Sequence, residues 1–427
     1  MEKVYPHTNK YSLSNMNNKT IAQSSSSLRK KSDNIGVRVY LDYAATAPVK
    51  KEVLEAMLPY LTEKFGNPSS LHSFGQEARG AVDDARRKIA SFLNCDISEI
   101  VFTSGGTESD NMAIKGLVLP FFYQGKTKPH VITSQIEHHA VINTCKMLEK
   151  NGVEVTYLKP NLDGLIEVKN VKAAIKENTV LVSIMYVNNE IGTVQPIREI
   201  GKMLEVENRN RKNRIYFHTD AVQATQYQNM NVDYLHVDLL TISGHKIGSP
   251  KGIGTLYLKK NTPIIAMMHG GEQENNRRAG TENVAGIVAL GQAVELINIK
   301  SAKKIEKLRD YFIDKILKEI PETELNGSKE NRSPNNANFY FKYIEGESIL
   351  LNLDLVGIAA SSGSACTSQS LEPSHVLVSI YNDPQRAHGS IRFTLGDKTT
   401  KKEIDYTVEK LKIIVKKLRD MSPLYKK

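Results

Sequence analysis

A lysine that could form a Schiff base lies directly after a predicted strand. Lys246 follows Ser243, Gly244 and His245 at the carboxyl end of the apolar run Leu239–Ser243. A lysine amine attacks carbonyl groups, most readily where burial lowers its pKa. An isolated lysine in such a segment is more often an ordinary surface residue, so its interpretation depends on what neighbouring strands carry.

A carboxylate stands at the end of the preceding predicted strand. Asp220 follows the run Ile215–Thr219. A carboxylate in this position is what a protonated pyridine nitrogen requires as a partner, although a lone aspartate there is more often a helix cap. Asp220 and Lys246 together describe a pocket for pyridoxal phosphate.

A phosphate cradle is predicted where another strand ends. The segment Thr103–Glu108 places Gly105, Gly106 and Thr107 between a strand and a helix. Backbone N–H groups at such a helix start, together with the helix dipole, favour an anion. Glycines of this kind also occur in ordinary helix capping, so the segment gains weight only from the other strand ends. The side chains that could add further phosphate contacts are Ser243 and His245.

Two further strand ends supply a flat ring and amide groups. His138 or His139, after the predicted strand Val131–Ser134, could stack on a pyridine ring. Asn188 and Asn189 follow the run Val180–Tyr186 and could reach the phenolic oxygen of the cofactor or a substrate carboxylate. Four strand ends thus carry complementary parts of one site, which chance alone would not produce.

A cysteine and an arginine in the carboxyl-terminal third could act on a substrate. Cys366 lies in the small, hydroxylated segment Ser361–Ser368, which predicts an exposed thiol on a mobile loop. Arg392 interrupts a strand-like run with a charge and could bind a carboxylate with both arms of its guanidinium, or form a structural ion pair. Cys95 and Cys145 stand in helical contexts and are interpreted as buried structural residues.

Composition excludes several classes of protein. Three cysteines in 427 residues make no disulfide framework or CxxC zinc site, which favours a reducing compartment. No run approaches the ~18 apolar residues of a membrane span. Of the net charge of +10, residues 1–38 carry +5 from seven basic and two acidic side chains, so the remainder is only mildly basic. Direct nucleic-acid binding is therefore not expected.

Short apolar runs alternate with helical stretches from Val39 onward, which predicts an open α/β sheet with helices on both faces. Several runs are almost continuously apolar, as expected of buried parallel strands. After about residue 300 the sequence pattern changes to α+β. The chain then ends in a predicted helix with an apolar stripe from Ile404 to Leu418, which should pack on its own domain. The candidate strands of the sheet are Ile100–Thr103, Val131–Ser134, Val153–Leu158, Val180–Tyr186, Ile215–Thr219, Leu239–Ser243 and Gly254–Leu258.

The predicted organisation has four parts. Residues 1–38 form a basic, Ser- and Asn-rich disordered extension, and residues 39–53 join the small domain. Residues 54–300 form the large cofactor-binding domain, and residues 301–427 form the small domain with the Cys366 loop. The extension also has features of a transit peptide. A disordered extension is the first interpretation, and with it we expect a cytoplasmic protein. If the extension is a transit peptide, the alternative location is the matrix of a mitochondrion or a related organelle.

These residues together resemble the cysteine desulfurases, pyridoxal phosphate enzymes of the class-V aminotransferase group with the fold-type I architecture. The resemblance covers about Tyr40 to Leu424, and its long cysteine loop is similar to the iron–sulfur assembly group, nitrogen-fixation type. The segments that carry it are Tyr40–Thr46, Phe65–Ser70, Phe102–Asn111, Glu137–His139, Val187–Gly192, Ser243–Lys246, Arg278–Asn283 and Ser361–His375.

The resemblance implies a role for each site residue. Lys246 holds the cofactor and moves protons, His138 stacks on the ring, and Asp220 pairs with its nitrogen. Arg392 holds the carboxylate of L-cysteine, and Cys366 takes the sulfur as a persulfide while alanine leaves. Gln223 and Asn189 contact the phenolic oxygen or the substrate. The implied phosphate ligands are Gly106, Thr107, Ser243 and His245, with Thr281 supplied by the other subunit of a homodimer.

The resemblance also implies partners. The persulfide would pass to an iron–sulfur scaffold protein or another sulfur acceptor, including the machinery of tRNA thiolation, with Cys366 as a transient ligand of the nascent cluster. Scaffold binding is expected to be weaker or differently arranged, because the sequence stops at Lys427 where long-loop relatives commonly continue. The alternatives are another class-V lyase or transaminase, such as a selenocysteine lyase, and a non-catalytic sulfur-relay or RNA-binding protein.

Overall fold

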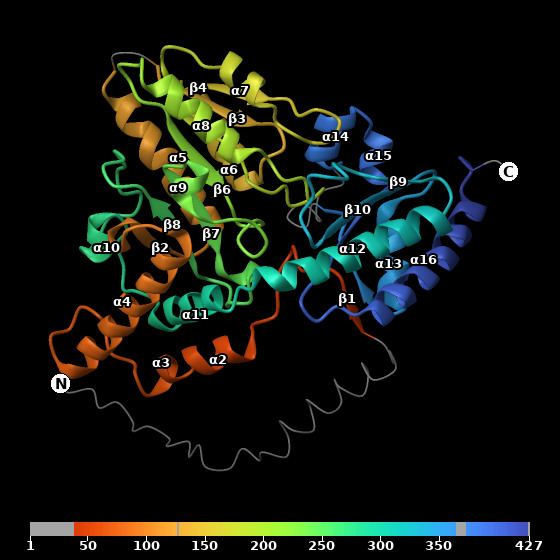
Figure 1. The fold of residues 1–427 in the computed structure, drawn as a ribbon, viewed down its shortest axis with the longest axis horizontal. Helices are drawn as coiled ribbons and strands as arrows, with labels where there is room; N and C mark the ends of the chain where they lie inside the picture. The colour runs from red at the N-terminus through yellow and green to blue at the C-terminus, as the bar shows by residue number, and fades with distance from the viewer. Residues whose placement is uncertain (1–37, 126–127, 364–372, 426–427) are drawn as a thin grey trace, which may run out of the picture.

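The computed structural model describes residues 38–125, 128–363 and 373–425. They form a large and a small domain that lie side by side, coloured red to green and cyan to blue in Figure 1. Within these residues no helix is long and apolar enough to cross a membrane.

The large domain is built on a mostly parallel seven-stranded sheet, as predicted. Its order is β2-β8-β7-β6-β5-β3-β4, and β8 runs antiparallel to both of its neighbours. The strands are β2 (Ile100–Thr103), β3 (His130–Ser134), β4 (Glu154–Leu158), β5 (Thr179–Ser183), β6 (Tyr216–Asp220), β7 (Leu239–Ser243) and β8 (Gly254–Leu258).

Both faces of this sheet are covered by helices. Leu181 of β5 packs in a core with α5 (Gly106–Tyr123) and α6 (His139–Lys150). Its neighbour Val182 points to the opposite face, into a core with other helices. Because both faces are apolar, the strands read as almost continuous hydrophobic runs. The helices of the second core are α4 (Ser73–Leu93), α8 (Ile197–Asn208) and α11 (Val284–Glu295).

Local hydrogen bonds explain where helix α4 begins and where strand β5 ends. Helix α4 begins at Ser73, because the His72 side chain accepts a hydrogen bond from the N–H of Gly75 and caps the helix. Strand β5 ends at Ser183, before the predicted Tyr186. The N–H of Met185 beyond it donates to the carboxyl group of Glu137 at 3.0 Å.

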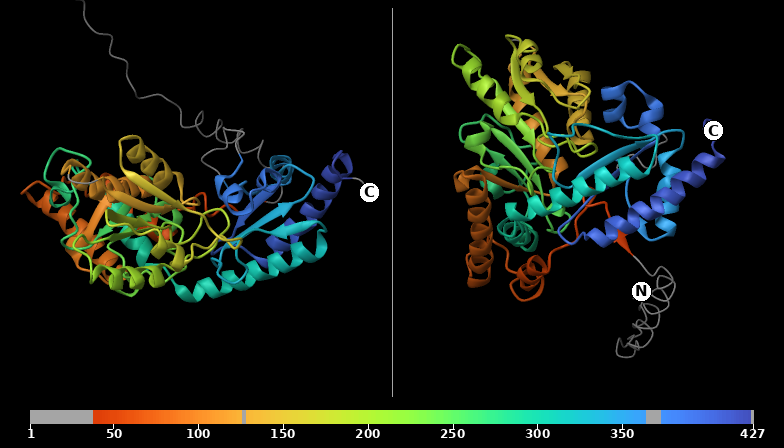
Figure 2. Two further views of the ribbon diagram at one scale, coloured as in Figure 1. Left: turned by 90° about the horizontal axis from the view of Figure 1, so that it is seen from above. Right: turned by 45° about the vertical axis from the view of Figure 1, so that its right-hand side comes forward.

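The small domain packs three helices against an antiparallel sheet in which β10 (Asn336–Phe341) lies between β9 (Thr323–Leu325) and β12 (Ser390–Thr394). The apolar stripe of the last helix faces this core through Ile404, Val408, Leu411 and Val415, which confirms the packing predicted for it. Helix α12 starts beside the large domain and runs along one side of the small domain (Figure 2). The helices are α12 (Ile299–Glu319), α13 (Gly346–Leu355) and α16 (Lys401–Met421).

The amino-terminal segment connects the two domains. Strand β1 (Val39–Tyr40) pairs in parallel with β11 (Ile358–Ala359) of the small domain. The N–H of Ala47 then donates to the carbonyl of His245 at 2.8 Å, before α2 (Lys51–Met57) and α3 (Pro59–Thr62) pack on the large domain. Residues between β1 and α2 therefore border both domains.

The remaining elements are short. Helix α14 (His375–Tyr381) packs its apolar side chains on Ile136 and Ile191 of the large domain, so it closes one side of the boundary between the domains. The others are α7 (Val168–Ala173), α9 (Val232–Leu235), α10 (Gln273–Asn276), α15 (Pro384–His388) and the 3-10 turns η1 (Ile97–Glu99) and η2 (Gly244–Lys246).

Candidate active site

A pocket of about 280 Å³ lies between the domains, at the carboxyl ends of the central strands. Open α/β sheets bind ligands at this edge. Of the twelve residues to which the resemblance gives a role, ten line it. They are Gly106, Thr107, His138, Asn189, Asp220, Gln223, Ser243, His245, Lys246 and Arg392.

One end of the pocket is built for an anion. Gly105 precedes α5 with φ 153°, a conformation that favours glycine, and it brings Gly106 and Thr107 to the start of the helix. A Cβ on Gly106 would lie 3.0 Å from a methyl group of Val222, so the backbone approaches the pocket closely. The first N–H groups of α5 have no acceptor within the helix and can serve a phosphate. Ser243 and His245 line the same pocket.

Asp220 ends β6 as a buried carboxylate at the floor of the pocket. Its Oδ1 accepts a hydrogen bond from the N–H of Val222 at 2.9 Å. Burial raises its pKa to about 6, while this hydrogen bond and the charge of Lys246 oppose that rise. Asp220 is therefore ionised at neutral pH and can face a cation.

Lys246 reaches across the pocket from η2 to the amino-terminal segment. Its Nζ donates to the carbonyl oxygens of Ala44 at 2.6 Å and Ala45 at 2.8 Å. The amide of Gln223 donates to the same Ala44 carbonyl at 3.0 Å. These contacts hold the amine beside Asp220 and Gln223 in the pocket.

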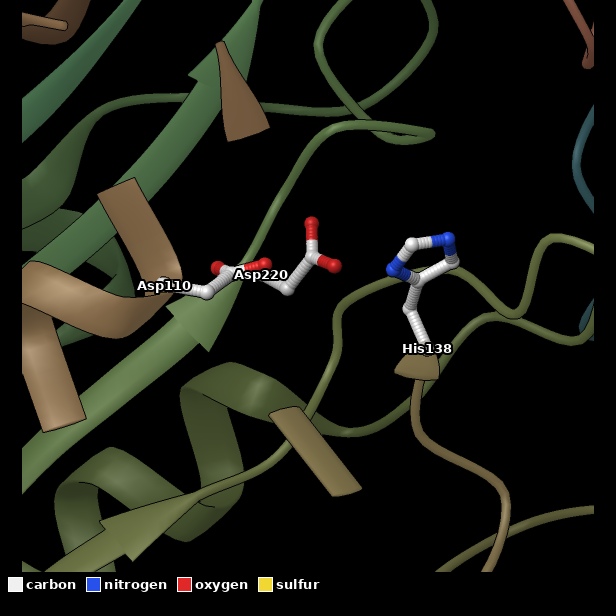
Figure 3. Close-up of side chains that lie close together, drawn as sticks. All are labelled: Asp110, His138 and Asp220. Atoms are coloured by element: carbon white, nitrogen blue, oxygen red, sulfur yellow. The ribbon is translucent and has the colours of Figure 1, made fainter. Parts of the chain in front are cut away.

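His138 provides a neutral ring on one wall. It caps α6, where its Nδ1 accepts from the N–H of Ala140 at 3.2 Å. Burial, and next the charge of Lys246, lower its pKa to about 4. Figure 3 shows the ring facing Asp220 across the pocket. The neighbouring His139 instead packs its ring 4.6 Å from that of His375, so the geometry favours His138 for stacking.

Arg392 of β12 forms the wall of the pocket on the side of the small domain. Its guanidinium, only 2% exposed, pairs with Asp42 at 2.8 Å and donates to the carbonyls of Asn189 at 2.7 Å and Gly363 at 3.1 Å. Its Nε has no hydrogen-bond partner among the described residues. The predicted structural ion pair is therefore present, and Arg392 also lines the pocket, where its binding of a substrate carboxylate stays a prediction.

Comparisons with known proteins agree on one family. Residues 39–407 match the family model described as aminotransferase class-V. Cysteine desulfurase IscS of Dictyoglomus turgidum is 55% identical over 90% of this chain and 96% of that protein, and IscS of Methanosarcina thermophila is 51% identical over 90% and 94%. The chain belongs to the cysteine desulfurases of the class-V aminotransferase family.

Solved structures agree with this assignment. A NifS-like protein superposes with a TM-score of 0.83 at 35% identity, over 90% of this chain and all of the other. The structure of SspA in complex with cysteine gives 0.75 at 40% identity, over 85% and all of the chain. The resemblance predicted from the sequence motifs is confirmed, and with it the fold.

This family depends on pyridoxal phosphate, and the pocket suits that cofactor. A helix start for the phosphate, a buried carboxylate for the ring nitrogen and an amine for the aldehyde line one cavity. A neutral imidazole stands beside them. Gly106 and Thr107 would hold the phosphate, and Asp220, His138 and Lys246 would hold the ring and its aldehyde.

The structure does not test two of the predicted residues. Cys366 falls outside the described residues, so its role stays a prediction. Thr281 is exposed and does not line the pocket of its own chain. Its predicted contribution to the pocket of a second subunit also remains a prediction.

Sequence reasoning gave no role to three acidic residues at the pocket. Asp42 holds Arg392, and Glu190 accepts a hydrogen bond from Ser374 at 2.5 Å while burial raises its pKa. Asp110 lines the floor. One of its carboxyl oxygens lies within 4.8 Å of a carboxyl oxygen of Asp220 and of a ring nitrogen of His138 (Figure 3). We attribute that grouping to cofactor binding rather than to a metal. Asp110 stands in the polar run Glu108–Asn111 near the start of α5, so no local signal distinguished it.

Proposed function

We propose that this desulfurase converts L-cysteine to L-alanine and carries the released sulfur as a persulfide on Cys366. The observation that carries the proposal is that Arg392 lines the same pocket as Lys246 and Asp220. That arrangement suits an α-amino acid, whose carboxylate binds the guanidinium while its α-carbon lies near the amine. The binding of cysteine by the SspA relative supports the choice of substrate.

The residues of this chain divide the reaction between them. Arg392 binds and orients the substrate carboxylate, and its buried Nε supplies a donor that Asp42 does not use. Asp220 keeps a negative charge at the floor, and the neutral ring of His138 covers one face and excludes water. Pyridoxal phosphate, when bound, supplies a sink for the electron pairs of bonds at the α-carbon.

Lys246 and Cys366 carry out the transfer. The Lys246 amine removes and returns protons at the substrate carbons. The thiolate of Cys366 attacks the substrate sulfur, so an S–S bond forms as the C–S bond breaks and its electron pair stays on carbon. Protonation of that carbon yields alanine. A thiol acceptor or reductant then discharges the persulfide.

We further infer a homodimer with iron–sulfur scaffold and other sulfur acceptors as partners. Apolar side chains from α2 to the start of α4 are exposed, including Leu54 at 49%, Phe65 at 70% and Leu71 at 91%. Exposed apolar surface of this kind marks interfaces. Thr281 would then reach the pocket of the partner subunit. The cytoplasmic location, or its organellar alternative, stays a prediction.

Product analysis tests the activity. The purified full chain, loaded with pyridoxal phosphate and given L-cysteine, should release alanine and sulfide in equal amounts, faster with added reductant. Cys366→Ser should keep the visible absorbance of the bound cofactor and lose both products, whereas the matched variant Cys95→Ser should keep them. Turnover of selenocysteine alone, or full turnover by Cys366→Ser, would contradict the proposal.

A further inference from the structure

We propose that Asp110 is a positioning residue that stays protonated at the floor of the pocket and holds the ionised Asp220 in place. The inference rests on the proposed function, in which Asp220 faces the ring nitrogen of the cofactor. It assigns a role to an acid that the mechanism above does not use.

The position of Asp110 is the first observation. It lies on α5 one turn beyond the phosphate end, it is 1% exposed, and it lines the pocket. Its Oδ1 has no hydrogen-bond partner among the described residues. Figure 3 shows its carboxyl group beside that of Asp220, with His138 beyond. A buried carboxylate with an unpaired oxygen would be costly if it were ionised.

Among the described residues, no neighbouring cation neutralises Asp110. The ring of His218 lies 3.7 Å from its Oδ1, but burial lowers the pKa of that histidine to about 3, so the ring is neutral. The ring nitrogens of His218 instead contact the hydroxyls of Ser183 at 2.9 Å and Thr241 at 3.1 Å. Thr241 also offers its hydroxyl to Asp110. The other titratable groups around this floor are Asp220, Glu137, His138 and Lys246.

The two carboxyl groups differ in what stabilises their charge. Burial, and then the negative charge of Asp220, raise the pKa of Asp110 well above its ordinary value. Asp220 has the N–H of Val222 and the charge of Lys246, and its pKa rises only to about 6. Two neighbouring buried carboxyls do not both ionise, and the less stabilised member keeps the proton. At neutral pH the pair therefore carries one charge, on Asp220.

A neutral Asp110 serves the site in two ways. It avoids a second negative charge that would repel Asp220, and its O–H is a donor beside an ionised acceptor. A hydrogen bond to a charged group is worth more than one between neutral groups. Asp110 thus keeps the Asp220 carboxylate ionised and oriented without touching the substrate.

Two variants and a matched control separate this role from a structural one. Asp110→Asn keeps a neutral group of the same shape, and Asp110→Leu keeps the volume without a donor. Ser109→Ala removes a buried hydroxyl one residue away, which bonds to Thr103 at 2.7 Å. For each full-length protein we would titrate the apoprotein with pyridoxal phosphate from pH 5 to 8 and record infrared spectra of the holoenzyme in H2O and D2O.

The proposal expects three results. Asp110→Asn should bind the cofactor within about threefold of wild type, because a neutral isostere replaces a neutral acid. Asp110→Leu should bind it roughly 10-fold more weakly and lose affinity at a higher pH, because Asp220 loses a donor. The wild-type minus Asp110→Asn infrared difference should contain the D2O-sensitive carbonyl band of a protonated carboxylic acid. Ser109→Ala should leave the pH profile unchanged.

Other outcomes overturn it. If Asp110 is ionised, the infrared band is missing, and Asp110→Asn moves the acid limb to lower pH by about one unit because a repulsive charge is gone. A pH profile that shifts equally in Ser109→Ala would reduce Asp110 to a structural residue. If Asp110→Leu does not fold, the infrared difference and Asp110→Asn still decide. A wild-type protein that binds the cofactor but releases no alanine would contradict the proposed function and leave this test intact.

Discussion

The floor of the pocket, at Asp220, Ser243 and Lys246, and its wall at Arg392 are held in place in different ways. At the floor, Asp220 and Ser243 are the last residues of β6 and β7, and Lys246 follows in the next turn, so the hydrogen bonds of one sheet fix their positions. At the wall, Arg392 depends on Asp42, Asn189 and Gly363. These partners come from segments far apart in the chain. The floor is a local product of strand ends, whereas the wall exists only where both domains meet.

Removing the amine should break the floor and have the largest effect. We expect Lys246→Ala to lower kcat by about 10²- to 10⁴-fold, the range of positioned acid–base groups, and to abolish the visible absorbance of the bound cofactor. Absorbance spectra and alanine release measure both. Lys251→Ala, an exposed lysine in the following turn, is the control. A Lys246→Ala protein with unchanged absorbance would contradict the assignment.

Removing the guanidinium should break the wall and leave the floor intact. Arg392→Ala is expected to raise KM for L-cysteine roughly 30-fold, which corresponds to about 2 kcal/mol of charge-assisted binding. Cofactor absorbance should persist. Arg419→Ala removes another buried arginine, which bonds only to the carbonyls of Lys342, Pro321 and Glu322 among the described residues, so it should cost stability without raising KM. A normal KM in Arg392→Ala would leave the substrate carboxylate without its proposed partner.

A fall in pH should weaken the binding of the cofactor at the floor of the pocket. As pH falls through about 6, Asp220 takes up a proton, and cofactor affinity should fall by up to about tenfold per pH unit. Folding of the apoprotein should respond in the opposite sense. The raised pKa makes the folded state bind more protons than the unfolded state between the ordinary value of 3.8 and about 6, so this group's cost to stability grows as pH rises through that window. Equilibrium titrations with pyridoxal phosphate at pH 5 to 8 measure the first effect. An affinity unchanged across this range, or an acid limb that survives in Asp220→Asn, would exclude Asp220 as its origin.

The smallest effect is expected from a substitution outside both the floor and the wall of the pocket. Cys145 is fully buried between α6 and the sheet, and burial raises the pKa of its thiol to about 12. Cys145→Ala should lower the free energy of unfolding by about 1 kcal/mol through a small cavity. Alanine release should not change. Chemical denaturation and the product assay check these two expectations, and a lost activity would assign this thiol a role that its burial argues against.

The contrast between floor and wall also explains which residues could be predicted. Lys246, Asp220 and His138 follow apolar runs whose ends mark the binding edge of a parallel sheet, so periodicity and residue type were enough to group them. Asp42 carries no such mark. Asp42 stands near the start of the chain, and nothing local indicates that it will meet Arg392, which lies 350 residues further along the chain.

The sequence by itself determined the seven strands, the helices on both faces, the strand-end chemistry and, through its motifs, the family. It did so because these features depend on local periodicity and on side chains a few residues apart. The tertiary structure decided that β8 runs antiparallel, that Arg392 is shared between an ion pair and the pocket, and that Asp110 lies beside Asp220. Each of these depends on contacts between distant segments, whose charges are set by burial that no local pattern records.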